Sequence, residues 1–419
     1  VDTETTTGRM GLARLLKGWI LPQLLLGYIF IVSGLIVCSL MLLSCIVWPF
    51  DRHLYRKINV YLGYSFWSHL TFLAQWWSGT EVYLYIDPEA YRKLGTEHVL
   101  VLMNHKYDID WLMTWILSER LGILGGCKFY GKESLRYLPL MGWAWYFTES
   151  IFLKRQWEHD RQIIARYIKR VLDFPKNYFS TILLCPEGTR FTEEKLKASQ
   201  EVCRAKGYPL TKHTLLPRTK GFILSMHGMQ GKVPAILDCT VAFPRDGPAP
   251  TLMNVINGVP MVAHFHCLRV PLEEVPIHTD EACGAWLRKQ FKKKDELYDC
   301  FLKTGKFEGK PVIVPRRPHD LLMWCFWAVI TCVPLFYYLA GLFLAGTLQQ
   351  QLIFLAIVVV GSVAIRLMIR VSETKTGSAY GKNTTSENGS THTKDNVSSR
   401  TTEILIGNTL KSKDAKKDE

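Results

Sequence analysis

The sequence predicts an α/β domain joined to membrane helices on both sides. Two long apolar stretches, residues 18–50 and 321–365, contain no charged residue. Each exceeds the roughly 20 residues that cross a bilayer. Between them, short apolar runs are followed repeatedly by a polar turn and an amphipathic helical pattern. That alternation is typical of an α/β sheet flanked by helices.

The expected boundaries divide the 419 residues into five parts. Residues 1–17 form an N-terminal tail, and residues 18–80 form membrane-embedded or interfacial helices. Residues 81–315 hold the α/β domain, which is long enough for one core. Residues 316–371 form a transmembrane hairpin. Residues 372–419, which are rich in Ser, Thr, Asn and Lys, form a disordered cytosolic tail.

The first apolar stretch is longer than one crossing requires. As a helix it would measure about 50 Å, against roughly 30 Å for the hydrocarbon core. It must therefore tilt, break near Pro22 or extend into the headgroups. Residues 58–79 carry no formal charge but contain many Trp and Tyr side chains among polar residues. This composition favours an interfacial or re-entrant helix, and a second full crossing stays open.

Three glutamines at residues 349–351 interrupt the second apolar stretch. The interruption predicts two crossing helices, residues 321–347 and 352–369, that meet at a polar tip. Arg366, in the second of them, would extend its charged end towards the membrane surface.

Charges around this hairpin predict its orientation. Arg316 and Arg317 precede it, and Arg366, Arg370 and Lys375 follow it, whereas the glutamine tip is uncharged. Cationic flanks favour the cytosolic side, so the domain and the C-terminal tail should both be cytosolic. There the acceptor sequons at Asn383, Asn388 and Asn396 would remain unglycosylated. Charges before and after the first stretch are balanced, so the side of the N-terminus stays open.

Composition narrows the function classes. A net charge of +14 suits nucleic acid, anionic lipid or a phosphorylated substrate. The membrane stretches favour the last two, so we expect no nucleic-acid partner. The 11 cysteines are odd in number, include no Cys-x-x-Cys pair and fall partly within the apolar stretches. This pattern argues against a disulfide framework and for a reducing compartment.

Within the domain, short apolar runs predict strands, and amphipathic runs between capping residues predict helices. The expected strands are residues 82–86, 99–103, 151–153, 181–185 and 233–237, with a further strand that carries His264 and His266. The expected helices are residues 110–120, 131–138 (which Pro139 ends), 158–172, 193–206 and 282–302. Thr192 should cap the fourth of these helices, which Gly207 ends.

A polar turn at residues 104–110 carries the main candidate site. It follows the strand at residues 99–103, and it contains His105 and Asp110. Five residues apart on a regular helix, these side chains would diverge by about 140°, so only a turn can bring them together. An imidazole held by a carboxylate can act as a general base. Alone the pattern is weak, because a chain with 12 histidines contains it by chance about 0.5 times. A capping aspartate beside an ordinary loop histidine is the alternative.

Two other strand ends carry cations. Glu187, Gly188, Thr189 and Arg190 follow the strand at residues 181–185. They offer a guanidinium, a hydroxyl and a flexible glycine whose neighbouring backbone N–H groups can approach an anion. Lys154 and Arg155 follow the strand at residues 151–153 in the same way. Ligands of open α/β sheets bind at such carboxyl ends.

The order of these blocks resembles that of the glycerolipid acyltransferases. Asn-His-x-x-x-x-Asp comes first, then Phe-Leu-Lys-Arg at residues 152–155, Glu-Gly-Thr-Arg at 187–190 and Val-Pro-Ala at 233–235. Within that family it looks most like the gamma and delta branch of the 1-acylglycerol-3-phosphate acyltransferases. The resemblance implies the family's mixed sheet flanked by helices, and it covers most of the chain.

The resemblance also implies roles. His105 would be the general base on the sn-2 hydroxyl of lysophosphatidic acid, and Asp110 would orient it. The hydroxyl would attack the thioester of acyl-CoA, which is a co-substrate rather than a bound cofactor, and phosphatidic acid would form. Lys132 would assist the oxyanion. The acceptor-binding positions would be Arg155, Glu187, Gly188, Thr189 and Arg190.

Two departures from the family pattern leave the headgroup and acyl preferences open. They are Phe152-Leu153-Lys154 in the second block and Leu237-Asp238 in the fourth. Alternatives are another headgroup, such as lysophosphatidylinositol, or a non-catalytic lipid-binding scaffold.

Two further interpretations are less economical. A hydrolase could use Cys185 as its nucleophile, but this cysteine ends an apolar run and should be buried. His264 and His266 could share a metal ion, but no third ligand lies nearby in sequence, so we expect no metal site. Residues 416–419, Lys-Lys-Asp-Glu, resemble a dilysine retrieval signal, which implies the endoplasmic-reticulum membrane.

Overall fold

The computed structural model describes residues 17–173 and 178–372. Most of the expected N-terminal tail and nearly all of the C-terminal tail lie outside these residues. The three acceptor sequons and residues 416–419 lie outside them as well, and so does the side chain of Arg366.

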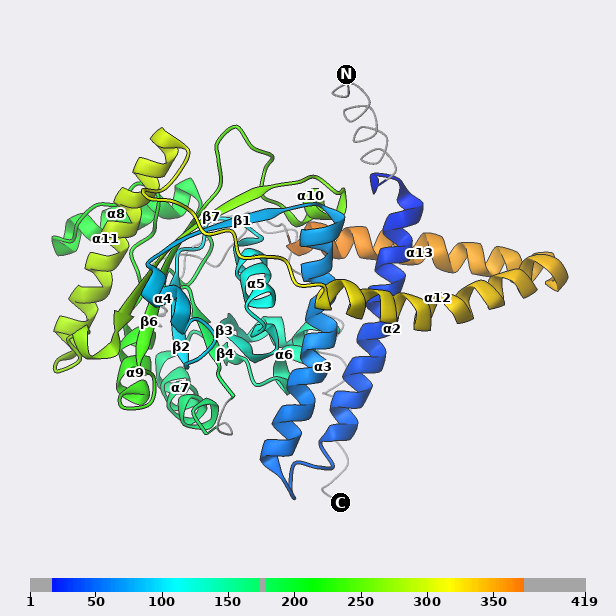
Figure 1. Cartoon of the computed structure of the whole chain (residues 1–419), viewed down its shortest axis with the longest axis horizontal. Coiled ribbons are helices and arrows are strands. Elements are labelled where there is room, and N and C mark those ends of the chain that lie inside the picture. Colours follow the sequence, from blue (N-terminus) through cyan, green and yellow to red (C-terminus); the bar gives the residue numbers. More distant parts are fainter. Residues whose placement is uncertain (1–16, 174–177, 373–419) are drawn as a thin grey trace, which may run out of the picture. The chain divides into compact units, whose positions relative to one another are not determined.

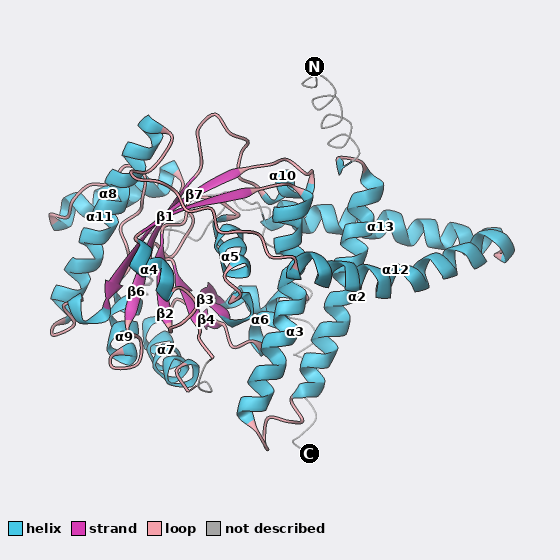
Figure 2. Ribbon diagram, in the orientation of Figure 1, coloured by secondary structure: helices cyan, strands magenta, loops and turns pink. Residues whose placement is uncertain are grey.

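A mixed sheet forms the core of the α/β domain in the described chain (Figures 1 and 2). Its seven strands lie in the order β1-β7-β6-β2-β5-β3-β4. Only β6 and β7 pair antiparallel, so β1 and β7 run against the other five strands. The strands are β1 (Glu81–Ile86), β2 (Val99–Met103), β3 (Cys127–Lys132), β4 (Ile151–Leu153), β5 (Thr181–Leu184), β6 (Ala235–Ala242) and β7 (Val262–Pro271). The mixed α/β sheet expected from the sequence is therefore confirmed.

Strand β3 was not predicted. Its sequence, Cys-Lys-Phe-Tyr-Gly-Lys, places a lysine where a buried strand normally carries an apolar residue. Lys128 is nevertheless buried, and its Nζ donates to the carbonyl of Thr148 at 2.6 Å. The helix expected at residues 131–138 is only a 3-10 turn, Glu133–Tyr137, after this strand. Strand β6, which was expected at residues 233–237, starts two residues later than predicted. It continues to Ala242, because all eight of its residues are buried.

Helices cover both faces of the sheet. Alternate residues of β2 point in opposite directions, and they enter two separate apolar clusters. One face packs against α5 (Asp110–Arg120) and α3 (Arg52–Phe72). The other packs against α7 (Trp157–Val171), α9 (Thr219–Met229) and α11 (Asp280–Thr304). Helix α8 (Glu193–Lys206) begins at the capping Thr192 and ends at the left-handed Gly207, as predicted.

Among the described residues, two helices are long and apolar enough to cross a membrane, α2 (Ile20–Ser44) and α12 (His319–Ala345). Helix α2 does not break at Pro22, because a proline in the first turn removes no intrahelical hydrogen bond. The aromatic segment after it forms most of α3 and a π-helical turn, Leu73–Trp77. Trp67 in this segment is fully buried, so part of its aromatic content packs the core instead of facing headgroups.

The hairpin turns earlier than predicted. Helix α13 (Leu348–Ser372) already contains the three glutamines in its first turn, and the connection is Gly346 and Thr347. Gln350 explains the shift, because its side chain accepts from the Thr347 N–H at 2.9 Å. In return the Thr347 hydroxyl accepts from the Gln350 N–H at 3.3 Å. This reciprocal pair is a capping box, which starts a helix.

A buried polar network joins the base of α12 to the end of α5. Asp320, which is fully buried, accepts from Gln75 Nε2 at 2.8 Å and from Trp76 Nε1 at 2.9 Å. Gln75 Oε1 in turn accepts from Arg120 Nε at 2.7 Å. Arg120 also forms an ion pair with Glu81 at 3.0 Å. The C-terminal hairpin is therefore attached to the helix that begins with Asp110.

Replacing Asp320 by alanine should destabilise the protein strongly. The change leaves the buried Gln75 donor without its acceptor, at about 1–3 kcal/mol, and removes the acceptor of the half-buried Trp76 as well. Thermal unfolding of the detergent-solubilised protein measures the effect. Lys93→Ala is the control, because Lys93 pairs with Glu89 in an exposed (i, i+4) ion pair, which is worth at most about 0.5 kcal/mol. Equal melting temperatures for both variants would show that the network is dispensable.

Candidate active site

The candidate site lies where parallel strands end. Strands β2, β5, β3 and β4 are parallel, so their carboxyl ends share one edge of the sheet. The turn after β2 carries His105, the turn after β5 carries Glu187 to Arg190, and Arg155 follows β4. The topology therefore brings together the blocks that the sequence places far apart.

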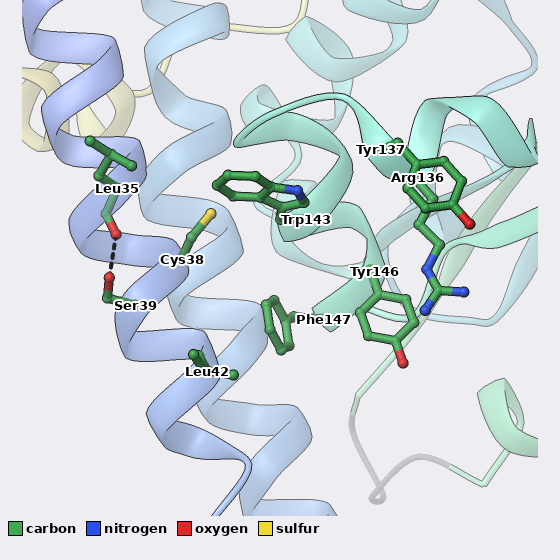
Figure 3. Close-up of a pocket in the computed structure, with 9 residues that line it drawn as sticks. All are labelled: Leu35, Cys38, Ser39, Leu42, Arg136, Tyr137, Trp143, Tyr146 and Phe147. Atoms are coloured by element: carbon green, nitrogen blue, oxygen red, sulfur yellow. Dashed lines mark hydrogen bonds between the residues drawn. The ribbon is translucent and has the colours of Figure 1, made fainter. Parts of the chain in front are cut away.

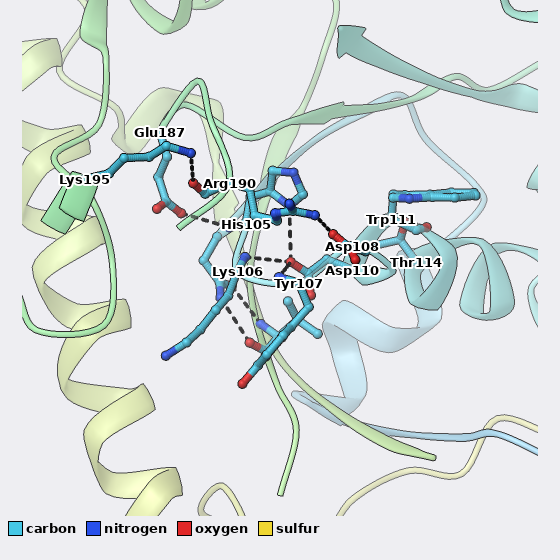
Figure 4. A network of polar contacts seen from close by, with 12 residues as sticks. His105, Lys106, Tyr107, Asp108, Asp110, Trp111, Thr114, Glu187, Arg190 and Lys195 are labelled. Carbon is cyan, nitrogen blue, oxygen red and sulfur yellow. Dashed lines mark hydrogen bonds and ion pairs between the residues drawn. The ribbon is translucent and has the colours of Figure 1, made fainter. Parts of the chain in front are cut away.

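The turn after β2 wraps around the Asp110 carboxylate (Figure 4). Its Oδ2 accepts from the backbone N–H groups of Lys106 and Tyr107, both at 2.7 Å. The same oxygen lies 3.2 Å from His105 Nδ1. Asp110 is fully buried, whereas the His105 side chain is 30% exposed. A proton on Nδ1 then bonds to Asp110, which leaves Nε2 as the basic nitrogen on the accessible imidazole.

Asn104 fixes the start of this turn. Its amide is buried, donates to the Val241 carbonyl at 3.0 Å and accepts from the Val241 N–H at 2.8 Å. The side chain thereby continues the pairing of β2 with β6 by one step. Sequence reasoning missed this role, although an Asn directly after a buried strand is a usable signal. The adjacent His105 is held to the sheet as a result.

Glu187 supports the same turn from β5. Its Oε1 accepts from the His105 N–H at 2.8 Å, and its Oε2 accepts from the Leu215 N–H at 3.0 Å. The residue is only 1% exposed. Burial raises the pKa of its carboxyl group to about 7, against the lowering effect of the two backbone donors. This geometry makes Glu187 a positioning residue, and its predicted contact with substrate stays a prediction.

Cations gather at the turn after β5. Arg155 Nη2 donates to the carbonyl of Gly188 at 2.8 Å, and Gly188 has the left-handed φ of 69° that its position in the turn requires. Arg190 forms an ion pair with Asp108. The Thr189 hydroxyl accepts from Lys195 Nζ at 2.9 Å. Sequence reasoning missed Lys195, because a lysine on an amphipathic helix normally faces solvent.

Lys132 is more remote. It is exposed at the end of β3, and β5 separates its strand from β2. It does share the same edge of the sheet. Its assistance to an oxyanion therefore stays a prediction.

Asp238, where the fourth block departs from the family pattern, has a structural role. Asp238 is buried on β6 and lies 2.5 Å from Nζ of Lys294, which comes from α11 and is 1% exposed. Lys294 also donates to the carbonyls of Leu102 at 3.1 Å and Cys239 at 2.6 Å. The acidic residue therefore pairs with a buried cation on the helix side of the sheet.

Neither less economical interpretation is favoured. Burial, with Glu187 and Asp110 nearby, raises the pKa of the Cys185 thiol well above its usual value, so a thiolate is disfavoured there. His264 instead lies against aromatic rings, with Nδ1 3.2 Å from the Tyr85 hydroxyl. Across residues 17–173 and 178–372, no three His, Cys, Asp or Glu side chains gather as a metal site would require.

An apolar pocket of about 400 Å³ lies beside α2 (Figure 3). Its other wall is formed by the 3-10 turn Glu133–Tyr137 and by α6 (Met141–Phe147). Because α2 is a candidate membrane helix, the pocket suits a hydrocarbon chain better than a polar ligand. The lining residues are Leu35, Cys38, Ser39, Leu42, Arg136, Tyr137, Trp143, Tyr146 and Phe147.

Known proteins resemble the chain over most of its length. The Acyltransferase family matches residues 85–236, and the Acyltransferase C-terminus family matches residues 254–327. The 1-acyl-sn-glycerol-3-phosphate acyltransferase delta of Homo sapiens is 44% identical over 372 residues, which are 89% of this chain and 97% of that protein. The gamma enzyme of Homo sapiens is 41% identical over 372 residues, 89% of this chain and 98% of its own.

A solved structure is also similar. It is the crystal structure of the 1-acyl-sn-glycerophosphate (LPA) acyltransferase PlsC from Thermotoga maritima. The match has 15% identity and a TM-score of 0.39, and it covers 68% of this chain and 96% of that one.

The buried carboxyl group of Glu187 predicts a pH-dependent stability. Its pKa is about 7 in the folded chain and near the ordinary 4.5 when unfolded, so the folded chain holds the proton more tightly. Stability should therefore fall as pH rises from about 4.5 to 7, by on the order of 3 kcal/mol. Glu187→Gln cannot titrate, so its melting temperature should rise relative to the wild type between pH 5 and pH 8.

The matched control is Glu201→Gln, a change of the same chemistry at an exposed position of α8. A difference between wild type and Glu187→Gln that stays constant over this pH range would contradict the raised pKa.

Proposed function

Because the chain belongs to the family of 1-acyl-sn-glycerol-3-phosphate acyltransferases, we propose that it acylates the sn-2 hydroxyl of lysophosphatidic acid with acyl-CoA. It is an acyltransferase, and the product of the proposed reaction is phosphatidic acid. The observation that carries the proposal is the His105–Asp110 pair beside a turn that carries Arg190 and that Arg155 contacts, at one sheet edge.

The proposed chemistry needs one base and no acyl-enzyme. Nε2 of His105 takes the proton of the sn-2 hydroxyl while the oxygen attacks the thioester carbonyl of acyl-CoA. The tetrahedral intermediate then expels the coenzyme A thiolate, and the imidazolium returns the proton to that sulfur. Asp110 holds the imidazole in one tautomer and stabilises the imidazolium. Lys132 would stabilise the negative oxygen of the intermediate.

The acceptor phosphate is assigned to the turn after β5. Arg155 and Arg190 supply guanidinium groups, which suit phosphate geometry. Thr189 and the backbone around Gly188 supply shorter donors. The supporting observation is that Gly188, Thr189 and Arg190 lie on one short turn, which Arg155 reaches from the end of β4 through the Gly188 carbonyl. This turn is joined to the His105 turn through the Phe191 N–H and the His105 carbonyl at 2.9 Å.

The two substrates arrive from different phases. The lysophospholipid lies in a bilayer, and α2 and α12 are suitable helices for holding the enzyme there. Acyl-CoA comes from water, which fits a catalytic domain in the cytosol, on the side of Arg316 and Arg317. We propose the endoplasmic-reticulum membrane as the location.

Acyl transfer from oleoyl-CoA tests the acceptor. The purified protein is offered lysophosphatidic acid, lysophosphatidylinositol, lysophosphatidylcholine and glycerol 3-phosphate. Lysophosphatidic acid should give the highest kcat/KM, because among these four acceptors it alone combines an accessible phosphate monoester with an acyl chain that lies in the bilayer. Highest activity with lysophosphatidylinositol would transfer the assignment to that headgroup, and no transfer at all would favour a lipid-binding scaffold.

Two substitutions test the mechanism. His105→Ala removes the base and should lower kcat by at least about 100-fold. Asp110→Asn keeps the shape but presents an amide N–H group to the donors of the turn, so kcat should also fall while KM for lysophosphatidic acid changes little. Steady-state rates measured with acyl-CoA saturating separate the two parameters. Full activity of His105→Ala would remove the general-base mechanism.

A further inference from the structure

Lys195 reaches back to the turn after β5, although it belongs to the helix that follows this turn. It lies in the first turn of α8, and its backbone N–H donates to the capping hydroxyl of Thr192 at 3.3 Å. Side chains of a helix lean towards its N-terminus. Nζ of Lys195 accordingly meets the preceding turn, where it donates to the Thr189 hydroxyl at 2.9 Å and to the Arg190 carbonyl at 2.8 Å.

This position is an unfavourable one for a cation. Lys195 is only 9% exposed, and the N-terminus of a helix carries partial positive charge. Burial is the first factor that lowers the pKa of Lys195, followed by Arg190 and Arg155, whereas Glu194 raises it. Both oxygens that accept from the ammonium group are neutral. The lysine is therefore better suited to orient these two oxygens than to balance a charge.

The contact with Thr189 fixes the direction of a hydrogen bond. A hydroxyl group has one proton and two lone pairs, whereas an ammonium group can only donate. The Thr189 oxygen must therefore accept from Lys195, and its own proton is left for another acceptor. Within residues 17–173 and 178–372 the hydroxyl makes no second hydrogen bond, and Thr189 is 8% exposed. A buried donor held in this way suits a ligand with acceptor oxygens.

The contact with Arg190 holds one peptide group from both sides. The Arg190 carbonyl accepts from Lys195. The N–H of Phe191 belongs to the same peptide group, and it donates to the His105 carbonyl at 2.9 Å. A carbonyl that is bonded to Lys195 is also kept from turning its negative oxygen towards an anion. Lys195 thereby ties the Thr189 hydroxyl to the turn that carries His105.

We propose that Lys195 is a positioning residue for the acceptor phosphate, because it restricts the Thr189 hydroxyl to donating its proton to that phosphate. The inference rests on the proposed function and deepens it. A phosphate monoester carries three strong acceptor oxygens, so it matches a hydroxyl that can only donate. Lys195 acts through Thr189 and the Arg190 carbonyl.

Lys195→Met keeps the apolar stem of the side chain and removes its donor. The KM for lysophosphatidic acid should rise roughly 10- to 100-fold, which corresponds to one hydrogen bond to a charged group. Both kcat and the KM for acyl-CoA should change by less than about threefold. Initial rates with one substrate varied and the other saturating measure these parameters. Lys197→Met is the matched control, because Lys197 is exposed on the same helix, and it should leave both KM values unchanged.

A double substitution separates this role from a general support of the fold. Without the Thr189 hydroxyl, Lys195 has no proton to direct. Thr189→Val combined with Lys195→Met should therefore have the same KM for lysophosphatidic acid as Thr189→Val alone, within about threefold, instead of the product of the two single effects.

Three results would overturn the inference. They are an unchanged KM for lysophosphatidic acid in Lys195→Met, single effects that multiply in the double variant, and a rise in the KM for acyl-CoA instead. If Lys195→Met does not fold, Lys195→Gln replaces it. Its amide can accept as well as donate, so the hydroxyl is no longer restricted and the KM should rise by a smaller factor; an unchanged KM again overturns the inference. A wild type that does not use lysophosphatidic acid refutes the proposed function itself, which distinguishes the two failures.

Discussion

The candidate site depends on one buried carboxylate. Glu187 accepts the N–H of His105 from one side and the N–H of Leu215 from the other, so three segments of backbone meet at a single side chain. The N–H groups of His105 and Leu215 cannot pair within the sheet, because His105 follows the end of β2 and Leu215 lies in a loop. A buried N–H without an acceptor is costly, so the carboxylate determines how these turns fit together.

Other buried polar side chains extend this arrangement. Asn104 fastens the turn after β2 to β6. Asp295 of α11 accepts from the backbone N–H groups of residues 212–214, and so holds the loop that presents Leu215 to Glu187. A buried polar network destabilises the fold when one of its groups has no hydrogen-bond partner. When every group is paired, the network holds the backbone in one conformation. The His105–Asp110 pair is therefore placed by residues that need not touch a substrate.

The sequence predicted the parts of the fold that follow from local patterns. Strands β2 and β4 and helix α5 have the expected bounds, and both ends of α8 are where the capping Thr192 and Gly207 predicted them. Strand β3 was missed, because its Lys128 is bonded to the carbonyl of residue 148, and the sequence around Lys128 gives no sign of that partner. The turn of the hairpin was placed too late, because polarity suggested a loop where Gln350 actually caps a helix.

The candidate site follows the same division. The geometry of His105 and Asp110 could be expected from a strand followed by a polar turn, since only a turn unites residues at that spacing. The positioning contacts of Asn104 and Lys294 could not, because each joins segments more than 130 residues apart.

The network at the base of α12 sets a limit on engineering a smaller, water-soluble enzyme. Composition suggests cutting the chain between residues 315 and 316. Arg120, however, donates to the Val314 carbonyl at 3.0 Å and to Gln75, which binds Asp320 beyond the cut. Arg120 is also the last residue of the helix whose first residue is Asp110. A truncation that retains the start of α12 would keep Gln75 bonded to both Arg120 and Asp320, whereas the shorter version would remove the acceptor of Gln75 and Trp76 behind the helix that begins with Asp110.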